Sequence, residues 1–253
     1  LHRLIRRQRQ MCIRDRFYLA PMEGITGYIV RNAYAHYFPY IDKYFTPFIP
    51  ATKKMSKKIK RDLAAENNEQ IRLVPQLIGN RADEFLMMIR QLEELGFTSV
   101  NLNFGCPSGT VVSKRKGAGF LADPKELEML LEEVLEKSPL AVSVKTRVGI
   151  KDPDEWEALC TAYAKFPLEE LIIHPRLQID YYSGTPRMET FARALEQIHV
   201  PLCYNGDICS AEDYKKVTAA FPAIDRIMIG RGLLENPGLV GEIKGNPPAD
   251  KAC

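Results

Sequence analysis

The sequence predicts one α/β domain, a (β/α)8 barrel of the TIM type. Short apolar runs rich in β-branched residues alternate with longer segments of helical periodicity, which indicates a parallel sheet. Eight such runs occur in 253 residues, and about 250 residues is the usual size of one such barrel. No GxGxxG motif follows the first run, which counts against the alternative, a doubly wound sheet with a dinucleotide site.

The eight expected strands are spaced along most of the chain. They cover residues 17–22, 43–49, 72–79, 99–107, 141–149, 170–176, 200–208 and 226–234. The clearest helices between them are residues 81–96, 123–137 and 210–221. Asp123 and Ser210 stand at N-cap positions, and Gly96 ends the first of these helices.

The composition is that of a soluble globular protein, with 45% hydrophobic and 26% charged residues. No apolar run approaches the roughly 20 residues that span a membrane, and no secretory signal opens the chain. The six cysteines show neither CxxC pairs nor zinc-site spacing. Scattered thiols indicate a reducing compartment, so we expect a cytoplasmic monomer without a metal or a membrane contact.

The two ends of the chain differ from its body. Residues 1–16 hold six arginines and one aspartate, and we expect them to be an extraneous or disordered leader. The remaining residues carry 29 basic and 31 acidic side chains, so bulk charge does not make the body a nucleic-acid-binding domain. We assign residues 17–244 to the barrel and 245–253 to a short polar tail.

Polar side chains recur where the expected strands end. In barrels of this kind the chemistry takes place at the carboxyl ends of the strands. Core packing alone would not place so many polar groups at equivalent points, so we expect them to form one site. They are Glu23, Gln76, Asn103, Cys106, Lys145, Arg147, His174, Arg176, Asn205, Asp207 and Arg231.

One of these segments, VNLNFGCP at 100–107, resembles the active-site signature of the tRNA-dihydrouridine synthases. Further segments match that family in order and spacing, and together they cover about residues 17–244. They are LAPMEGIT (19–26), PQLIGN (75–80), VKTRVG (144–149), IIHPR (172–176), YNGDI (204–208) and IGRGLLENP (229–237). The resemblance implies reduction of the 5,6 double bond of uridine in tRNA by tightly bound FMN, which NADPH reduces.

The resemblance also implies roles for the site residues. Hydride passes from flavin N5 to uracil C6, and Cys106 gives a proton to C5. A thiol suits this role because its usual pKa, near 8.5, keeps it protonated at neutral pH. Without the resemblance, Cys106 would read as a small buried hydrophobic residue.

FMN is expected to contact most of the remaining polar positions. Lys145 would face the N1–C2=O edge of the reduced ring, and His174 would donate to the flavin or to its phosphate. The phosphate is expected in the last two loops, where glycine lets the backbone approach and arginine adds charge. The full expected cofactor set is Pro21, Met22, Glu23, Gln76, Lys145, His174, Asn205, Gly206, Asp207, Gly230 and Arg231.

The substrate is expected to contact another group of residues, namely Asn103, Arg147, Arg176, Lys114 and Arg115. Two basic stretches, 53–61 and 113–116, fall in loops at the catalytic end, where RNA phosphates would arrive. A charge run is also typical of an ordinary solvated face. Residues 109–119 are expected to form a lid over the base.

The chain departs from the family pattern at two points. Gly27 stands where the family usually has aspartate, and the chain stops before the family's C-terminal helical tRNA-binding domain. We therefore expect complete FMN binding and weakened tRNA binding. The alternatives are an FMN barrel acting on a free pyrimidine or another RNA, and a non-catalytic RNA-binding barrel.

Overall fold

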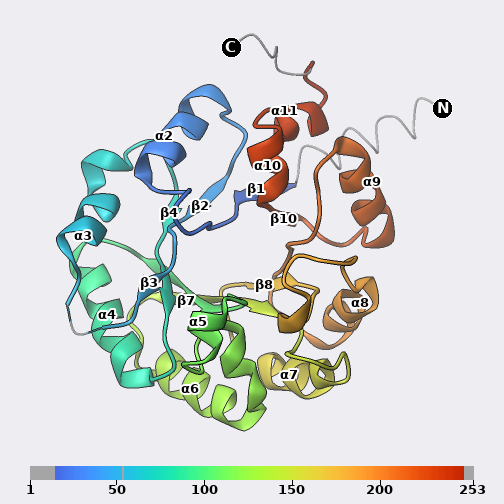
Figure 1. Ribbon diagram of the computed structural model, residues 1–253. Helices are drawn as coiled ribbons and strands as arrows, with labels where there is room; N and C mark the ends of the chain where they lie inside the picture. The colour runs from blue at the N-terminus through green and yellow to red at the C-terminus, as the bar shows by residue number, and fades with distance from the viewer. Residues whose placement is uncertain (1–14, 53, 248–253) are drawn as a thin grey trace.

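The computed structural model describes residues 15–52 and 54–247, and the predictions for residues 1–14 and 248–253 lie outside these ranges. Its strands form a parallel ring with helices around the outside (Figure 1). The strands are β1 (Arg16–Leu19), β2 (Lys43–Phe45), β3 (Ile49–Pro50), β4 (Leu73–Val74), β5 (Gln76–Ile78), β6 (Ser99–Phe104), β7 (Ala141–Arg147), β8 (Leu171–His174), β9 (Leu202–Tyr204) and β10 (Arg226–Ile229). The prediction of a (β/α)8 barrel is confirmed, and β1 begins at Arg16, one residue before the expected start.

Two of the eight expected strands are interrupted, which is why ten are found. The strand expected at 43–49 breaks at Pro47, and the one expected at 72–79 breaks at Pro75, because proline has no N–H to give to a ladder. The halves still pair with each other in parallel, β2 with β4 and β3 with β5. Since β1 also pairs with β10, these segments complete a closed ring of eight strand positions.

The helices follow the signals in the sequence. They are α2 (Tyr28–Tyr37), α3 (Lys57–Leu63), α4 (Ala82–Glu94), α5 (Gly109–Val112), α6 (Pro124–Lys137), α7 (Glu155–Ala164), α8 (Met188–Gln197), α9 (Ala211–Ala220), α10 (Arg231–Glu235) and α11 (Leu239–Ile243). Asp123 accepts from the N–H groups of Lys125 and Glu126 at 3.0 and 3.1 Å, and Ser210 accepts from Asp213 N at 3.1 Å. Gly96 ends the turn after α4 at φ +87°, a conformation that favours glycine. Among the described residues, no helix has both the length and the apolar character needed to cross a bilayer.

The core has an inner and an outer layer. Between the ring and the helices lie large side chains such as Phe85, Leu131 and Trp156, all essentially without solvent contact. A smaller apolar cluster fills the barrel and consists of Tyr18, Ala20, Phe45, Val74, Ile172, Cys203 and Met228. Because this cluster closes the interior, a ligand can enter only above it, at an end of the strands.

A buried ion pair lies at the amino-terminal end of the barrel. Lys43 Nζ lies 2.5 Å from Glu170 Oε1, and Tyr18 OH donates to Glu170 Oε2 at 3.0 Å. Arg226 Nε lies 3.8 Å from the same carboxylate. The Glu170 carboxylate, just before β8, therefore joins residues of β1, β2 and β10.

The end of the segment expected to be a lid is part of the wall. Residues 109–119 form α5 and enter a 3-10 helix, Gly117–Ala122, whose residues 117–121 are buried. A Cβ on Gly117 would lie 2.8 Å from the Cys106 carbonyl oxygen, and one on Gly119 would lie 2.7 Å from that of Val112. The lid prediction is wrong for residues 117–119, because they pack directly beneath the end of β6, and it stays a prediction for residues 109–116.

Replacing Glu170 by alanine should lower the free energy of unfolding by about 3–5 kcal/mol, because the buried Lys43 would lose the carboxylate 2.5 Å from its Nζ and keep Glu169 at 3.8 Å. Urea titration measures this quantity. Glu133→Ala is the control, since Glu133 forms an exposed pair with Lys137, and it should cost about 0.5 kcal/mol or less. A Glu170→Ala loss as small as the control's would contradict the analysis.

Candidate functional site

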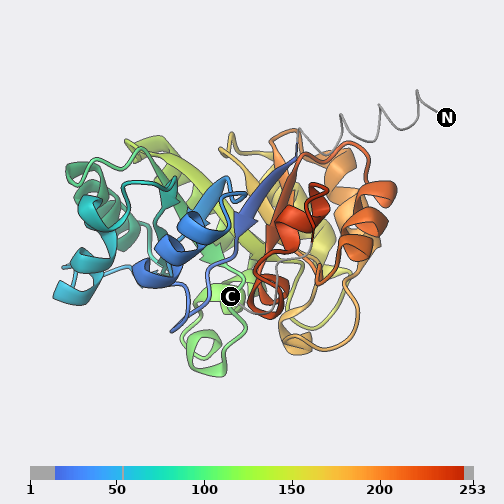
Figure 2. The same cartoon turned by 90° about the horizontal axis from the view of Figure 1, so that it is seen from above.

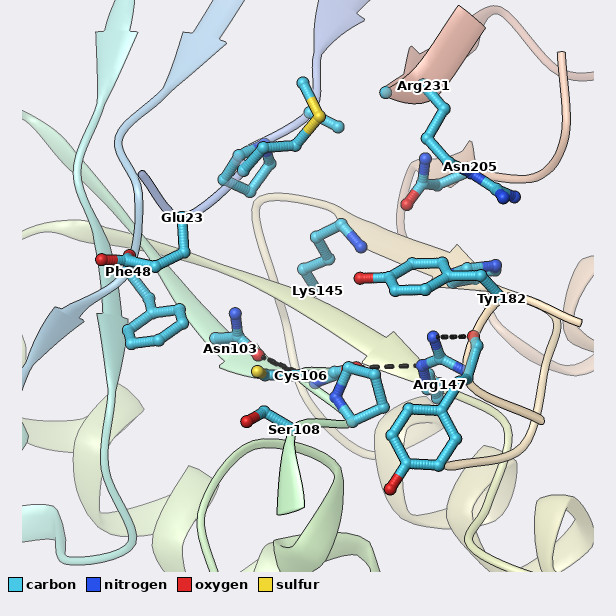
Figure 3. Close-up of a pocket in the computed structure, with 18 of the residues that line it drawn as sticks. Glu23, Phe48, Asn103, Cys106, Ser108, Lys145, Arg147, Tyr182, Asn205 and Arg231 are labelled. Atoms are coloured by element: carbon cyan, nitrogen blue, oxygen red, sulfur yellow. Dashed lines mark hydrogen bonds between the residues drawn. The ribbon is translucent and has the colours of Figure 1, made fainter. Parts of the chain in front are cut away.

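A cavity of about 630 Å³ opens at the carboxyl ends of the strands. We call it the mouth cavity. Figure 3 shows Cys106, Lys145 and Tyr182 around this hollow, with Glu23 and Phe48 on one side and Asn205 and Arg231 on another. Of the residues predicted from the sequence, its walls contain Pro21, Met22, Glu23, Gln76, Asn103, Cys106, Lys145, Arg147, His174, Asn205, Gly206, Asp207, Gly230 and Arg231.

A row of amide side chains holds Cys106 in place. Asn103 Oδ1 accepts from the backbone N–H groups of Gly105 and Cys106 at 3.0 and 2.9 Å (Figure 3). Asn103 Nδ2 donates to Gln76 Oε1, and Gln76 Nε2 donates to Asn101 Oδ1, both at 2.8 Å. Asn103 and Gln76 therefore fix the turn after β6 as well as lining the cavity.

The Cys106 thiol is suited to hold a proton at neutral pH. Burial raises its pKa above the usual value, while the Ser108 backbone and the cations Lys145 and Arg147 lower it. Burial is the largest of these effects, so the thiol stays protonated, and the cations favour the thiolate left after the proton is given away. This combination is what a general acid requires.

Lys145 is a cation inside the barrel without an anion beside it. It follows Val144 on β7, and Asn103 on β6 is its neighbour in the ladder. No carboxylate within residues 15–52 or 54–247 lies within ion-pair distance of its Nζ. Burial, followed by the charge of Arg147, lowers the pKa of Lys145 to about 8. The mouth cavity therefore presents a positive charge that a bound anionic group would stabilise.

His174 is neutral and donates into the site through one nitrogen. Burial lowers its pKa well below the usual value, and the charges of Lys145, Arg147, Arg176 and Arg231 lower it further. Its Nε2 lies 3.2 Å from Arg176 Nη1, and arginine can only donate. Nε2 is therefore the acceptor, and the proton of the neutral ring is on Nδ1.

The prediction that Arg176 binds substrate is wrong. Its side chain has no solvent exposure and does not line the mouth cavity. Nη1 and Nη2 donate to the two Asp207 oxygens at 2.9 and 2.5 Å, and Nε donates to the Ser183 carbonyl at 3.0 Å. Gly184 O and His174 Nε2 take the remaining two N–H groups. All five donors are used, so Arg176 holds the loop after β8 instead.

Arg147 has a mixed role. It lines the mouth cavity but is 1% exposed. It donates to the carbonyls of Gly105 at 3.0 Å, Leu177 at 2.6 Å and Tyr181. Arg147 thus ties the turn that carries Cys106 to the loop after β8. Figure 2 shows α5 and that loop projecting from the same end of the barrel.

In the last two loops of the barrel, Asp207 and Arg231 form an ion pair, and the backbone at Gly206 is closely packed. Asp207 Oδ1 accepts from Arg231 Nη2 at 2.7 Å, so Asp207 orients the half-exposed arginine. A Cβ on Gly206 would lie 2.1 Å from the Tyr204 hydroxyl, so no side chain fits there. Asn205 Nδ2 donates to the Met228 carbonyl at 2.9 Å and locks β9 to β10.

Lys114 and Arg115 do not reach the mouth cavity. Both are exposed, and Arg115 is paired with Glu126 of α6. Their charges therefore lie outside the wall of the cavity. An RNA phosphate contact outside the cavity remains a prediction.

The cavity walls also contain residues that were not among the site residues predicted from the sequence, including Ile25, Phe48, Tyr181 and Tyr182. The guanidinium carbons of Arg147 and Arg231 lie 5.6 and 5.1 Å from the centre of the Tyr182 ring, within cation–π range. The sequence feature that could have indicated the two tyrosines is that they stand side by side, at 181 and 182, soon after the IIHPR segment. The sequence of a long loop does not predict which of its side chains face the cavity.

Among the described residues, no group of three His, Cys, Asp or Glu side chains is placed to hold a metal ion. The site therefore offers a thiol, a neutral imidazole, amides and cations. This set can hold an anionic ligand and give a proton to it.

The depressed pKa of Lys145 predicts how stability depends on pH. Its charged form is disfavoured in the fold, so the unfolded chain binds more protons between about pH 8 and its usual pKa of 10.5. The contribution of Lys145 to the free energy of unfolding of the flavin-free protein should therefore increase with pH across that window. Lys145→Met should be more stable than the parent at pH 7, and urea titrations should show this advantage shrinking toward pH 10. An advantage that is constant with pH would contradict the assignment.

Comparison with known proteins agrees with this chemistry. The profile of the dihydrouridine synthase (Dus) family matches residues 18–252. A tRNA-dihydrouridine(16) synthase of Pseudomonas putida is 33% identical over 230 residues, covering 87% of this chain and 71% of that protein. The tRNA-dihydrouridine synthase B of Pasteurella multocida is 30% identical over 233 residues, covering 90% and 68%.

Solved structures share the fold at low sequence identity. A variant of NCR from Zymomonas mobilis has a TM-score of 0.61 at 13% identity, covering 93% of this chain and 88% of that chain. Morphinone reductase in complex with tetrahydroNAD has a TM-score of 0.62 at 12% identity, covering 94% and 89%. The family profile spans nearly the whole barrel and all of the mouth cavity, and the chain belongs to the dihydrouridine synthase family.

Proposed function

We propose that this protein reduces a uridine of tRNA to dihydrouridine, with a flavin bound in the mouth cavity and a nicotinamide nucleotide as reductant. One observation carries the proposal. In a member of the dihydrouridine synthase family, a protonated thiol at Cys106 and an unpaired cation at Lys145 line the same cavity. We further propose that the flavin is FMN and that the reductant is NADPH.

The residues present fit a flavin. Lys145 lies inside the barrel without an anion, and a reduced flavin ring carries negative charge near N1. Ala20, Pro21 and Met22 supply an apolar wall beside it. A bound flavin would supply the hydride that adds to C6 of the uracil.

A phosphate would be held by the last two loops. Arg231 offers a half-exposed guanidinium that Asp207 orients, and Gly206 and Gly230 also line the mouth cavity. His174 can donate from Nδ1 to the same cofactor. These contacts require no rearrangement of the buried Arg176, which keeps Asp207 in place.

Cys106 would act as the general acid. Its Sγ proton passes to C5 of the uracil, and the thiolate that remains lies near the charges of Lys145 and Arg147. Asn103 holds the Cys106 backbone and would turn its second Nδ2 hydrogen toward the substrate. Arg147 contributes charge to the pocket, since three of its five donors hold loops.

The other candidate functions separate by substrate. An FMN barrel acting on a free pyrimidine would reduce uracil or orotate and leave tRNA unchanged. A barrel that modified another RNA would leave tRNA unchanged and reduce that RNA. A non-catalytic RNA-binding barrel would bind tRNA without taking up flavin.

Cys106→Ala tests the acid directly. Reduction of the bound flavin by NADPH should continue at the parental rate, while reoxidation by tRNA should slow by about 100-fold or more, the usual worth of a positioned acid. Stopped-flow absorbance of the flavin follows both half-reactions. Cys209→Ala is the matched control, because that thiol is exposed and lies outside the mouth cavity. If the alanine enzyme is reoxidised by tRNA at the parental rate, Cys106 is not the acid.

A further inference from the structure

We propose that a second hollow beside the mouth cavity binds a nucleobase adjacent to the reduced uridine; this inference rests on the proposed function. The hollow has a volume of about 540 Å³ and lies between the loop before α2, the β2–β3 segment and α3. We call it the side hollow. Figure 1 shows α2 and α3 as neighbours on the outside of the barrel.

The side hollow adjoins the mouth cavity. Glu23, Ile25 and Phe48 lie on the walls of both. Figure 3 shows Glu23 and Phe48 together at the edge of the mouth cavity. A uridine in the mouth cavity belongs to a polymer, so the next nucleotide must lie just outside. The side hollow, which shares three wall residues with the mouth cavity, is placed to receive it.

The walls of the side hollow suit a flat base. They include the side chains of Tyr28, Ile29, Phe48 and Ile59. Ile29 is 69% exposed, so its apolar surface is open to a ligand. Unpaired bases of RNA bind by stacking on aromatic and apolar side chains, with little dependence on base identity.

The rim of the side hollow carries positive charge. Lys58 and Arg61 of α3 lie on it, and in the part of the chain that the structure describes neither has an ion-pair partner. The nearby Asp62 is occupied, since its Oδ2 lies 3.1 Å from Arg31 Nη1 and its Oδ1 accepts from Tyr28 N at 2.7 Å. Two free cations beside an apolar hollow complement a base and its phosphate.

Glu23 is the remaining acidic group at the junction, and it is exposed. A carboxylate there accepts a hydrogen bond from an exocyclic amino group, as on cytosine. A protein segment would also cover the apolar wall. The free cations and the wall shared with the mouth cavity favour RNA over a protein.

Tyr28→Ala tests the stacking surface. With a tRNA transcript whose reduced uridine has been located, the variant should raise KM by about tenfold and leave kcat within twofold. The measurement is repeated with two abasic transcripts. One lacks the base on the 5′ side of that uridine, and the other lacks the base on its 3′ side. On one of these abasic transcripts the parent and the variant should have the same KM. If the difference persists on both, the ring does not bind a neighbouring base and the proposal fails.

A second test changes the cations on the rim and leaves Tyr28 in place. It uses the double variant Lys58→Ala/Arg61→Ala. This pair should raise KM several-fold more than Lys57→Ala with Lys60→Ala, which removes equal charge from the same helix but outside the hollow. Equal effects of the two pairs would indicate a diffuse electrostatic contact or a different partner and would overturn the subsite. Absence of uridine reduction by the parental enzyme would refute the proposed function instead.

Discussion

Two lysines inside the same barrel have opposite electrostatic surroundings, and this difference organises the molecule. Lys43, at the amino-terminal end, is neutralised by Glu170 at 2.5 Å. Lys145, at the carboxyl end, has no carboxylate beside it among the described residues, and burial lowers its pKa to about 8. A charge left unpaired in a buried place costs stability, so its presence indicates a ligand that completes it. One end of the barrel thus stabilises the fold, and the other is prepared for an anionic cofactor.

The cavity above Lys145 is held in shape by groups that do not themselves react. Asn103 fixes the turn that carries Cys106, and Arg147 joins that turn to the loop after β8. Arg176 and Asp207 form a buried support beneath the half-exposed Arg231. Such supports limit the motion of the reacting groups, which is what placing a thiol against a small flat substrate demands.

Much of this arrangement follows from local features of the sequence. Helix starts at Asp123 and Ser210 are decided by hydrogen bonds within one turn, so they were correctly predicted. The cavity residues were found because every parallel strand of a barrel ends at the same rim. This rule places Cys106 and Lys145 at the rim, and the family resemblance supplies the role of Cys106.

The failures have a common cause, which is pairing between distant parts of the chain. Arg176 looked free in the sequence, but Asp207, 31 residues away, takes two of its donors. The end of the supposed lid packs under Cys106 because Gly117 fits against its carbonyl group. Tyr182 became part of the site only through the path of its loop, which spacing alone does not determine.

Mass spectrometry of tRNA incubated with the flavin-loaded protein and NADPH tests the central claim most directly. The account predicts that one uridine gains two hydrogen atoms, and that Lys145→Met slows this gain because the cavity loses its unpaired charge. Unchanged tRNA in the presence of bound, reducible flavin would contradict it.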